Sequence, residues 1–195
     1  HRVDRRQRQM CIRDRGNTVA VWGVGGVGAH LVQLSKLAGA VPVIAVDLND
    51  AVLERAKRLG ADYAFRSDDP DLMKKIEDIT DGRMVDIAFD AVGIQPTLRA
   101  CVESLDINGK AVSIGLSPQN IDAGTFLEFN LKKKQLLGHL GYKRQDIARL
   151  ADMLSYGRLD LTESISKIIP LTDIKQGIDD LENHRGNPIR ILVKP

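Results

Sequence analysis

The sequence predicts a doubly wound α/β fold, in which helices cover both faces of a parallel sheet. Three observations predict it. From residue 17 onward, short apolar runs typical of buried strands alternate with segments of helical periodicity. The run 43–46 is continuously apolar, as expected of a strand buried on both faces of its sheet. Strands that alternate with helices of this length pair in parallel through right-handed crossovers.

Each element up to residue 138 follows from this alternation. Apolar residues recur at helical spacing from Val27 to Ala38, so a helix is predicted between the first two strands. Asn49 can cap the next helix, and Gly60 ends it. The predicted strands are 18–22, 43–46, 63–65, 85–89, 110–114 and 135–138, and two later helices are predicted at 72–79 and 96–105.

The pattern of apolar residues changes after residue 142. Apolar stripes predict helices around 147–154 and 174–181, and apolar runs predict strands at 164–169 and 189–193. These elements have few partners of their own. We therefore expect a dinucleotide-binding domain at 16–141 and a segment at 142–195 that belongs to a catalytic domain, most of which lies outside this chain.

The first fifteen residues differ from the rest of the chain. They carry six arginines and two aspartates, and without them 22 basic and 24 acidic residues remain. Residues 16–195 therefore carry no excess of basic residues that would indicate nucleic-acid binding. Residues 10–15 back-translate to ATG TGT ATA AGA GAC AG plus one base, which resembles the transposon-end adapter of sequencing libraries. We interpret residues 1–15 as a non-native or disordered tail.

Composition excludes several other classes of protein. The chain of 195 residues is 43% hydrophobic and 28% charged, which is ordinary for a soluble globular protein. No apolar run approaches the roughly 18 residues that a membrane span needs. Two cysteines make neither a disulfide framework nor a clustered zinc site. A cytoplasmic location and no metal ligands within this chain are expected.

A glycine-rich turn follows the first predicted strand. Gly23-Val24-Gly25-Gly26-Val27-Gly28 has the spacing G-x-G-x-x-G between a strand and a helix. Gly23 permits the tight turn, Gly25 lets the backbone approach a pyrophosphate, and Gly28 allows close packing of helix on strand. The amide groups of the helix N-terminus then attract phosphate. The motif predicts a Rossmann fold that binds a dinucleotide.

Asp47 ends the second strand, nineteen residues beyond Gly28. A carboxylate at this position accepts hydrogen bonds from the adenosine ribose. It would repel the 2′-phosphate of NADP, and no lysine or arginine occurs between Leu48 and Glu54 to compensate. NAD is therefore the expected cofactor.

Several further segments extend this pattern. They are residues 21–28, 46–47, 56–62, 86–93, 109–116 and 186–193. Together they resemble the medium-chain dehydrogenase/reductase superfamily, and within it the zinc-dependent alcohol dehydrogenase branch. The resemblance covers residues 17–193.

The resemblance implies further contacts to the cofactor. Loop residues after the fourth, fifth and sixth strands would line the adenosine and nicotinamide sides, and an arginine in the last segment would reach the pyrophosphate. These residues are Ala91, Val92, Gly93, Ile114, Gly115, Leu116, His139, Leu140 and Arg190. No residue of the chain is expected to be catalytic, because the family's zinc ligands and proton relay belong to the domain before the glycine motif.

The implied function is the NAD-binding portion of an oxidoreductase that moves hydride between an alcohol or polyol and a nicotinamide, with zinc in the intact parent only. This portion alone is expected to be inactive. A zinc-free NADPH-dependent quinone or enoyl reductase and a non-catalytic nucleotide-sensing module are alternatives. The resemblance also implies a homo-oligomer through the sheet edge near Ile121–Leu131. No nucleic-acid or membrane partner is expected.

Overall fold

The computed structural model describes residues 16–183, 185–186 and 188–195, so the prediction for the tail at 1–15 lies outside the described residues. Among them, the boundary between two compact units falls between Gly141 and Tyr142. The first unit holds the predicted sheet.

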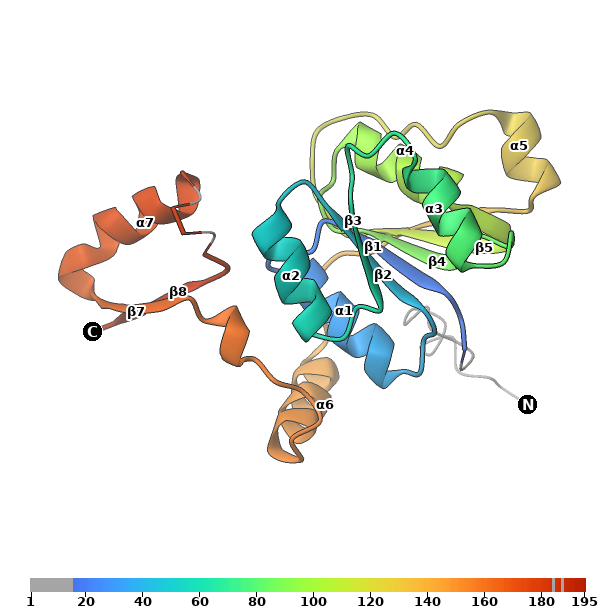
Figure 1. The fold of residues 1–195 in the computed structure, drawn as a ribbon. Helices are drawn as coiled ribbons and strands as arrows, with labels where there is room; N and C mark the ends of the chain where they lie inside the picture. Colours follow the sequence, from blue (N-terminus) through green and yellow to red (C-terminus); the bar gives the residue numbers. More distant parts are fainter. Residues whose placement is uncertain (1–15, 184, 187) are drawn as a thin grey trace. The chain divides into compact units, whose positions relative to one another are not determined.

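A six-stranded parallel sheet forms the centre of the first unit (Figure 1). Its strand order, β3-β2-β1-β4-β5-β6, is that of a Rossmann fold. The predicted fold class is confirmed. The strands are β1 (Val19–Trp22), β2 (Val43–Asp47), β3 (Tyr63–Arg66), β4 (Val85–Asp90), β5 (Leu105–Ser113) and β6 (Gln135–Gly138).

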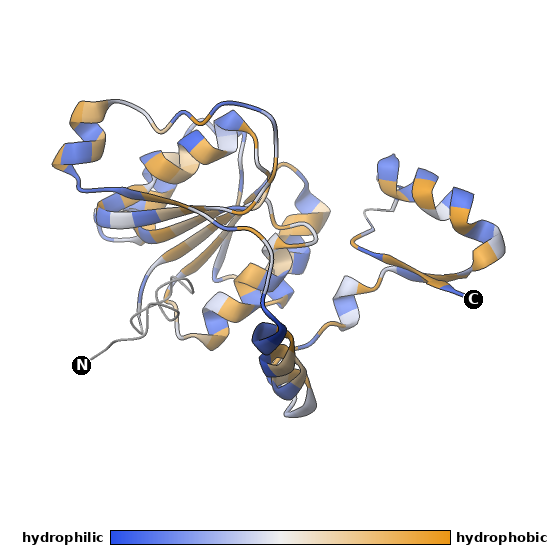
Figure 2. Ribbon diagram, turned by 180° about the vertical axis from the view of Figure 1, so that it is seen from behind, coloured by the Kyte–Doolittle hydropathy of each residue, from blue (hydrophilic) through white to orange (hydrophobic). Residues whose placement is uncertain are grey.

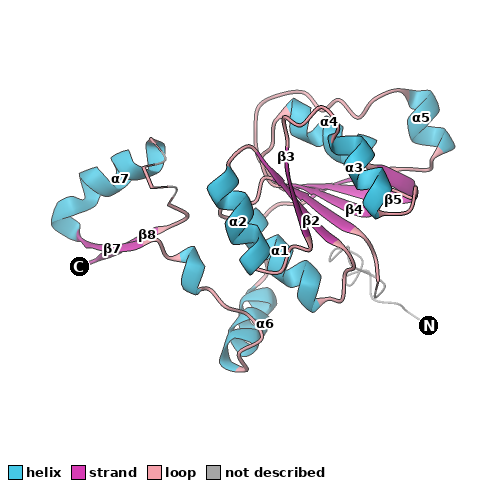
Figure 3. Cartoon of the chain, viewed as in Figure 1, coloured by secondary structure: helices cyan, strands magenta, loops and turns pink. Residues whose placement is uncertain are grey.

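Helices cover both faces of this sheet, as the ribbon coloured by secondary structure shows (Figure 3). Helices α1 (Gly28–Leu37) and α2 (Asp50–Arg58) pack on one face, and α3 (Leu72–Ile79) and α4 (Gln95–Glu103) pack on the other. Alternate residues of the strands supply the two hydrophobic cores, and the central strands β1 and β2 are therefore buried and hydrophobic along almost their whole length (Figure 2).

Two boundaries in this unit differ from the prediction by more than one residue. The helix expected at 96–105 ends at Glu103, and β5 begins at Leu105 rather than at residue 110. Leu105 pairs with Val85 across an irregularity in the register, and Asn108 takes a positive φ of 62°. Asp106, Asn108 and Gly109 interrupt the apolar pattern here, so the start of this strand does not read as an apolar run.

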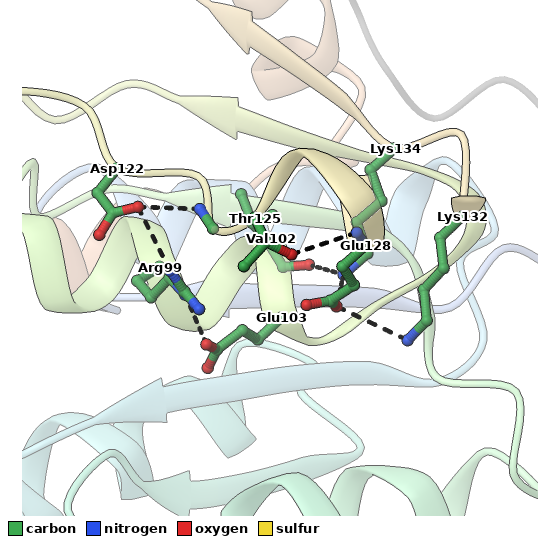
Figure 4. Close-up of polar contacts among 9 residues, drawn as sticks. Arg99, Val102, Glu103, Asp122, Thr125, Glu128, Lys132 and Lys134 are labelled. Carbon is green, nitrogen blue, oxygen red and sulfur yellow. Dashed lines mark hydrogen bonds and ion pairs between the residues drawn. The ribbon is translucent and has the colours of Figure 1, made fainter. Parts of the chain in front are cut away.

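A short helix, α5 (Phe126–Leu131), was not predicted. It is attached to the unit by Lys134, whose side chain is 1% exposed and whose Nζ donates to the Glu128 carboxylate at 2.8 Å (Figure 4). The same ammonium donates to the Val102 carbonyl at 2.7 Å. This buried cation therefore joins α5 to the end of α4.

The second unit consists of α6 (Arg144–Ser155), β7 (Lys167–Pro170), α7 (Ile174–Glu182) and β8 (Ile191–Lys194). The two strands pair in parallel, and α7 packs on them, with Gly177 against Ile169. The predicted strand at 164–169 is wrong at its start, because residues 162–164 form a 3₁₀ turn.

Candidate functional site

A cleft of about 330 Å³ opens at the carboxyl ends of β1, β2 and β4. Ligands of open α/β sheets bind at this edge, where the strand order reverses. Here the reversal lies between β1 and β4. The walls consist of Trp22, Gly23, Gly25, Gly26, Val27, Gly28, Val46, Asp47, Leu48, Ser67, Ala91, Val92, Ile94 and Thr97.

The glycine-rich turn forms the floor of the cleft. Gly23 has a φ of +80°, which allows the sharp turn out of β1. A Cβ on Gly28 would lie 1.8 Å from the Gly23 carbonyl oxygen, so α1 starts in direct contact with the strand end. At Gly25, by contrast, a Cβ would meet no atom within 4 Å. Space in front of Gly25 is therefore open for a ligand.

Helix α1 points its N-terminus into this space. The first turn carries no acidic residue, and its N-cap residue, Val27, makes no side-chain capping hydrogen bond. Within the described part of the chain, the amides of Gly26, Val27 and Gly28 donate no backbone hydrogen bond. These donors and the helix dipole favour a phosphate group at this position.

Asp47 stands at the end of β2 on the wall of the cleft. Its Oδ2 accepts from the Val24 amide at 2.9 Å, and its Oδ1 accepts from the Asn49 amide at 3.0 Å. The carboxylate is therefore held in one orientation from both sides. An ionised carboxylate has about four acceptor positions, so it retains capacity to accept from ribose hydroxyls.

The loop after β4 forms the opposite wall. Asp90, which is 1% exposed, organises this loop: its Oδ1 accepts from the Val92 and Gly93 amides at 3.1 Å and from the Thr97 hydroxyl at 2.9 Å. A Cβ on Gly23 would lie 2.4 Å from the Val92 side chain. The glycine-rich turn and this loop therefore fit against each other.

Several predicted residues do not line the cleft. The side chain of Val24 is buried, although its amide binds Asp47. Gly93 and Gly115 lie backbone to backbone, since a Cβ on Gly115 would be 2.1 Å from the Gly93 nitrogen. The others follow β5 and β6 at the same sheet edge but outside the cleft, namely Ile114, Leu116, His139 and Leu140. Arg190 lies in the second unit, so its prediction remains untested.

Sequence reasoning missed six wall residues and the organising residue of the loop. The wall residues are Trp22, Val46, Leu48, Ser67, Ile94 and Thr97. Most of them occupy the last position of a parallel strand or the turn after it. The rule that ligands bind at the carboxyl edge of such a sheet would have selected them. The role of Asp90 in holding the loop is visible only in the tertiary structure.

The described residues offer no group of three or more His, Cys, Asp or Glu side chains that could hold a metal ion. Cys101 is buried, and desolvation, with a smaller effect of the Asp90 charge, raises the pKa of its thiol. It is therefore a small core residue of α4. In the part of the chain that the structure describes, no helix has the length and apolarity to cross a bilayer.

This chain is similar to known dehydrogenases over most of its length. The model of the zinc-binding dehydrogenase family matches residues 26–156. Alcohol dehydrogenase of Cupriavidus necator is 30% identical over 182 residues, covering 92% of this chain and 50% of that protein. NAD-dependent alcohol dehydrogenase of Sulfurisphaera tokodaii is 29% identical and is covered to 51%. The chain thus spans about half the length of these relatives.

Among solved structures, 2R,3R-butanediol dehydrogenase from Bacillus subtilis superposes with a TM-score of 0.84 at 28% sequence identity. The superposition covers 94% of this chain and 52% of that one. An alcohol dehydrogenase from Thermus sp. ATN1 has the same fold, with a TM-score of 0.87 and 23% identity. Each superposition covers more than nine-tenths of this chain and about half of the other.

Proposed function

Because the chain belongs to the zinc-binding dehydrogenase family, we propose that it is the NAD-binding portion of an oxidoreductase that moves hydride between an alcohol or polyol and a nicotinamide cofactor. The cofactor itself accepts or donates the hydride. The residues of this chain bind and orient it. A cytoplasmic location and a small-molecule alcohol as partner are part of the same proposal.

One observation carries the proposal: the open space at Gly25 faces free helix amides on one side and the fixed carboxylate of Asp47 on the other. The amides suit a pyrophosphate, and the carboxylate suits the ribose of the same dinucleotide. The charge of Asp47 also favours NAD over NADP. The name of the S. tokodaii relative, an NAD-dependent enzyme, agrees with this choice.

The described residues do not fit a catalytic zinc site, so no step of the reaction is assigned to zinc in this chain. We place the zinc, the proton relay and the substrate pocket in the rest of the parent protein. A zinc-free reductase that uses NADPH remains the alternative within the same superfamily. A nucleotide-sensing module is the alternative outside catalysis.

The test is a calorimetric titration of NAD and of NADP into the purified chain. We expect NAD to bind about tenfold or more tightly than NADP, and Asp47→Asn to weaken NAD binding by a similar factor. Asp86→Asn is the matched control. Like Asp47, Asp86 accepts from a backbone amide, that of Thr18 at 2.8 Å, but it lies at the end of β4 away from the cleft.

Equal affinity for the two cofactors would contradict the assignment of NAD, and tighter NADP binding would favour the reductase alternative. The chain is also expected to show no alcohol-dependent formation of NADH, measured at 340 nm. Turnover by the purified chain would contradict the proposal that the catalytic groups lie in the rest of the parent protein.

A further inference from the structure

Arg66 ends β3, the strand next to β2, and is in register with Asp47. Neighbouring residues of a parallel sheet that are in register project from the same face. The next residue, Ser67, lines the cleft, and its amide donates to the Asp47 carbonyl at 3.0 Å. Arg66 is therefore a cation at the rim of the cleft, beside the carboxylate assigned to the ribose.

Two carboxylates occupy the guanidinium of Arg66. Its Nε and Nη2 donate to the two oxygens of Asp68 at 2.9 and 2.8 Å, which is a bidentate pair. Its Nη1 donates to Asp50 Oδ1 at 3.0 Å. Asp50 is the first residue of α2, in the segment that follows Asp47. These contacts are solvent-exposed, so they direct the guanidinium more than they stabilise the fold.

We infer that Arg66 is a second determinant of cofactor choice, kept from the 2′-phosphate of NADP by its pairing with Asp50 and Asp68. This inference rests on the proposed function, because it concerns the ribose end of the same cleft. An NADP 2′-phosphate that binds beside Asp47 would also face the carboxylates of Asp50 and Asp68. The guanidinium of Arg66 is already hydrogen-bonded to both of them. An arginine without these partners can bind phosphate through the same guanidinium N–H groups.

This arrangement predicts that the removal of Asp47 alone is insufficient for a change of cofactor. Asp47→Asn removes one repulsive charge and leaves Arg66 engaged. The triple variant Asp47→Asn, Asp50→Asn, Asp68→Asn also breaks both ion pairs of Arg66, because amides of the same shape replace its two carboxylate partners. We expect the triple variant to bind NADP about tenfold more tightly than the single variant. Adding Arg66→Gln to the triple variant is expected to abolish this gain.

A control variant of the same net charge separates the effect of freeing Arg66 from the effect of removing negative charge near the cleft. Asp69 and Asp71 lie in the same loop, and the Asp69 carboxylate accepts from Lys75 Nζ and from the Asp71 amide. The side-chain partners of the Arg66 guanidinium are Asp50 and Asp68 instead. The variant Asp47→Asn, Asp69→Asn, Asp71→Asn therefore has the same net charge as the triple variant. It is expected to gain at most about threefold in NADP affinity.

The experiment is titration of NAD and NADP into each full-length variant, with thermal unfolding to confirm that the variant is folded. If the triple variant does not fold, the double variant Asp47→Asn, Asp68→Asn is used, with an expected gain of about threefold. No gain, an equal gain in the control, or a gain that survives Arg66→Gln would each overturn the inference. If the unmutated chain binds neither cofactor, the proposed function fails first and the inference fails with it.

Discussion

Gly25 and Gly28 lie three residues apart in one turn but have different constraints. A Cβ at Gly28 would overlap the Gly23 carbonyl, whereas a Cβ at Gly25 would point into the open cleft. We therefore expect Gly28→Ala to destabilise the chain by about 1–3 kcal/mol, because the start of α1 must move. Gly25→Ala is expected to leave stability unchanged and to weaken NAD binding about tenfold or more.

Urea unfolding and NAD titration of the two variants measure both effects. The two substitutions add the same methyl group to the same turn, so each serves as the control for the other. Equal loss of stability in both would mean that the turn has no room for a ligand. Unchanged NAD affinity in Gly25→Ala would show that the dinucleotide does not approach this backbone.

At the scale of elements, the attachment of α5 depends on an ion pair with one buried partner. The hydrogen bond from Lys134 lowers the pKa of the Glu128 carboxyl, with a smaller electrostatic contribution from the same lysine. A lowered pKa means that the folded chain holds fewer protons than the unfolded chain in this range. The stabilisation is therefore present above the ordinary pKa of 4.5 and is lost as the pH falls through the folded value.

We expect Glu128→Gln to lower the unfolding temperature at pH 7 and to reduce the loss of stability between pH 5 and about pH 3, compared with the unmutated chain. Thermal unfolding across this range measures the difference. Glu103→Gln is the control, since Glu103 pairs with Arg99 (Figure 4) and both side chains are partly exposed, so the pair contributes little to stability. Identical pH profiles for Glu128→Gln and the unmutated chain would contradict this role.

At the scale of the whole molecule, β6 is an edge of the sheet, and the segment 121–131, which precedes it in the chain, exposes several large apolar side chains. Phe126 is 89% exposed, and Leu127 and Leu131 are each 71% exposed. An apolar surface of this kind marks an interaction site. We propose that it pairs with a second copy of the chain, with no nucleic acid or membrane involved.

Sedimentation of the purified chain is expected to show a dimer, and Phe126→Glu is expected to shift it to monomer without loss of NAD binding. Leu37→Glu is the control, because Leu37 is also exposed but lies on α1, away from this edge. A monomeric unmutated chain, or equal dissociation in both variants, would exclude this interface.

Local chemistry explains which features were predictable. The glycine spacing, the Asn49 cap and the apolar strands depend on residues close in sequence, and the structure contains all of them, with the Asn49 side chain accepting from the Ala51 amide at 3.0 Å. The helix at 72–79 and the strand at 135–138 have the predicted bounds. The errors occurred where Asp106, Asn108 and Gly109 interrupt the apolar pattern of a strand, and where a helix is as short as α5.

By itself, the sequence determined the fold class, the family and the glycine-rich turn proposed to receive a phosphate, because backbone geometry and periodicity are encoded within a few residues. Only the tertiary structure decided what surrounds that turn. Asp90 holds the opposite loop, and Arg66 beside Asp47 is paired with Asp50 and Asp68. These contacts exist because folding places β3 next to β2 and β4 next to β1, and no local pattern specifies the side-chain partners that meet there.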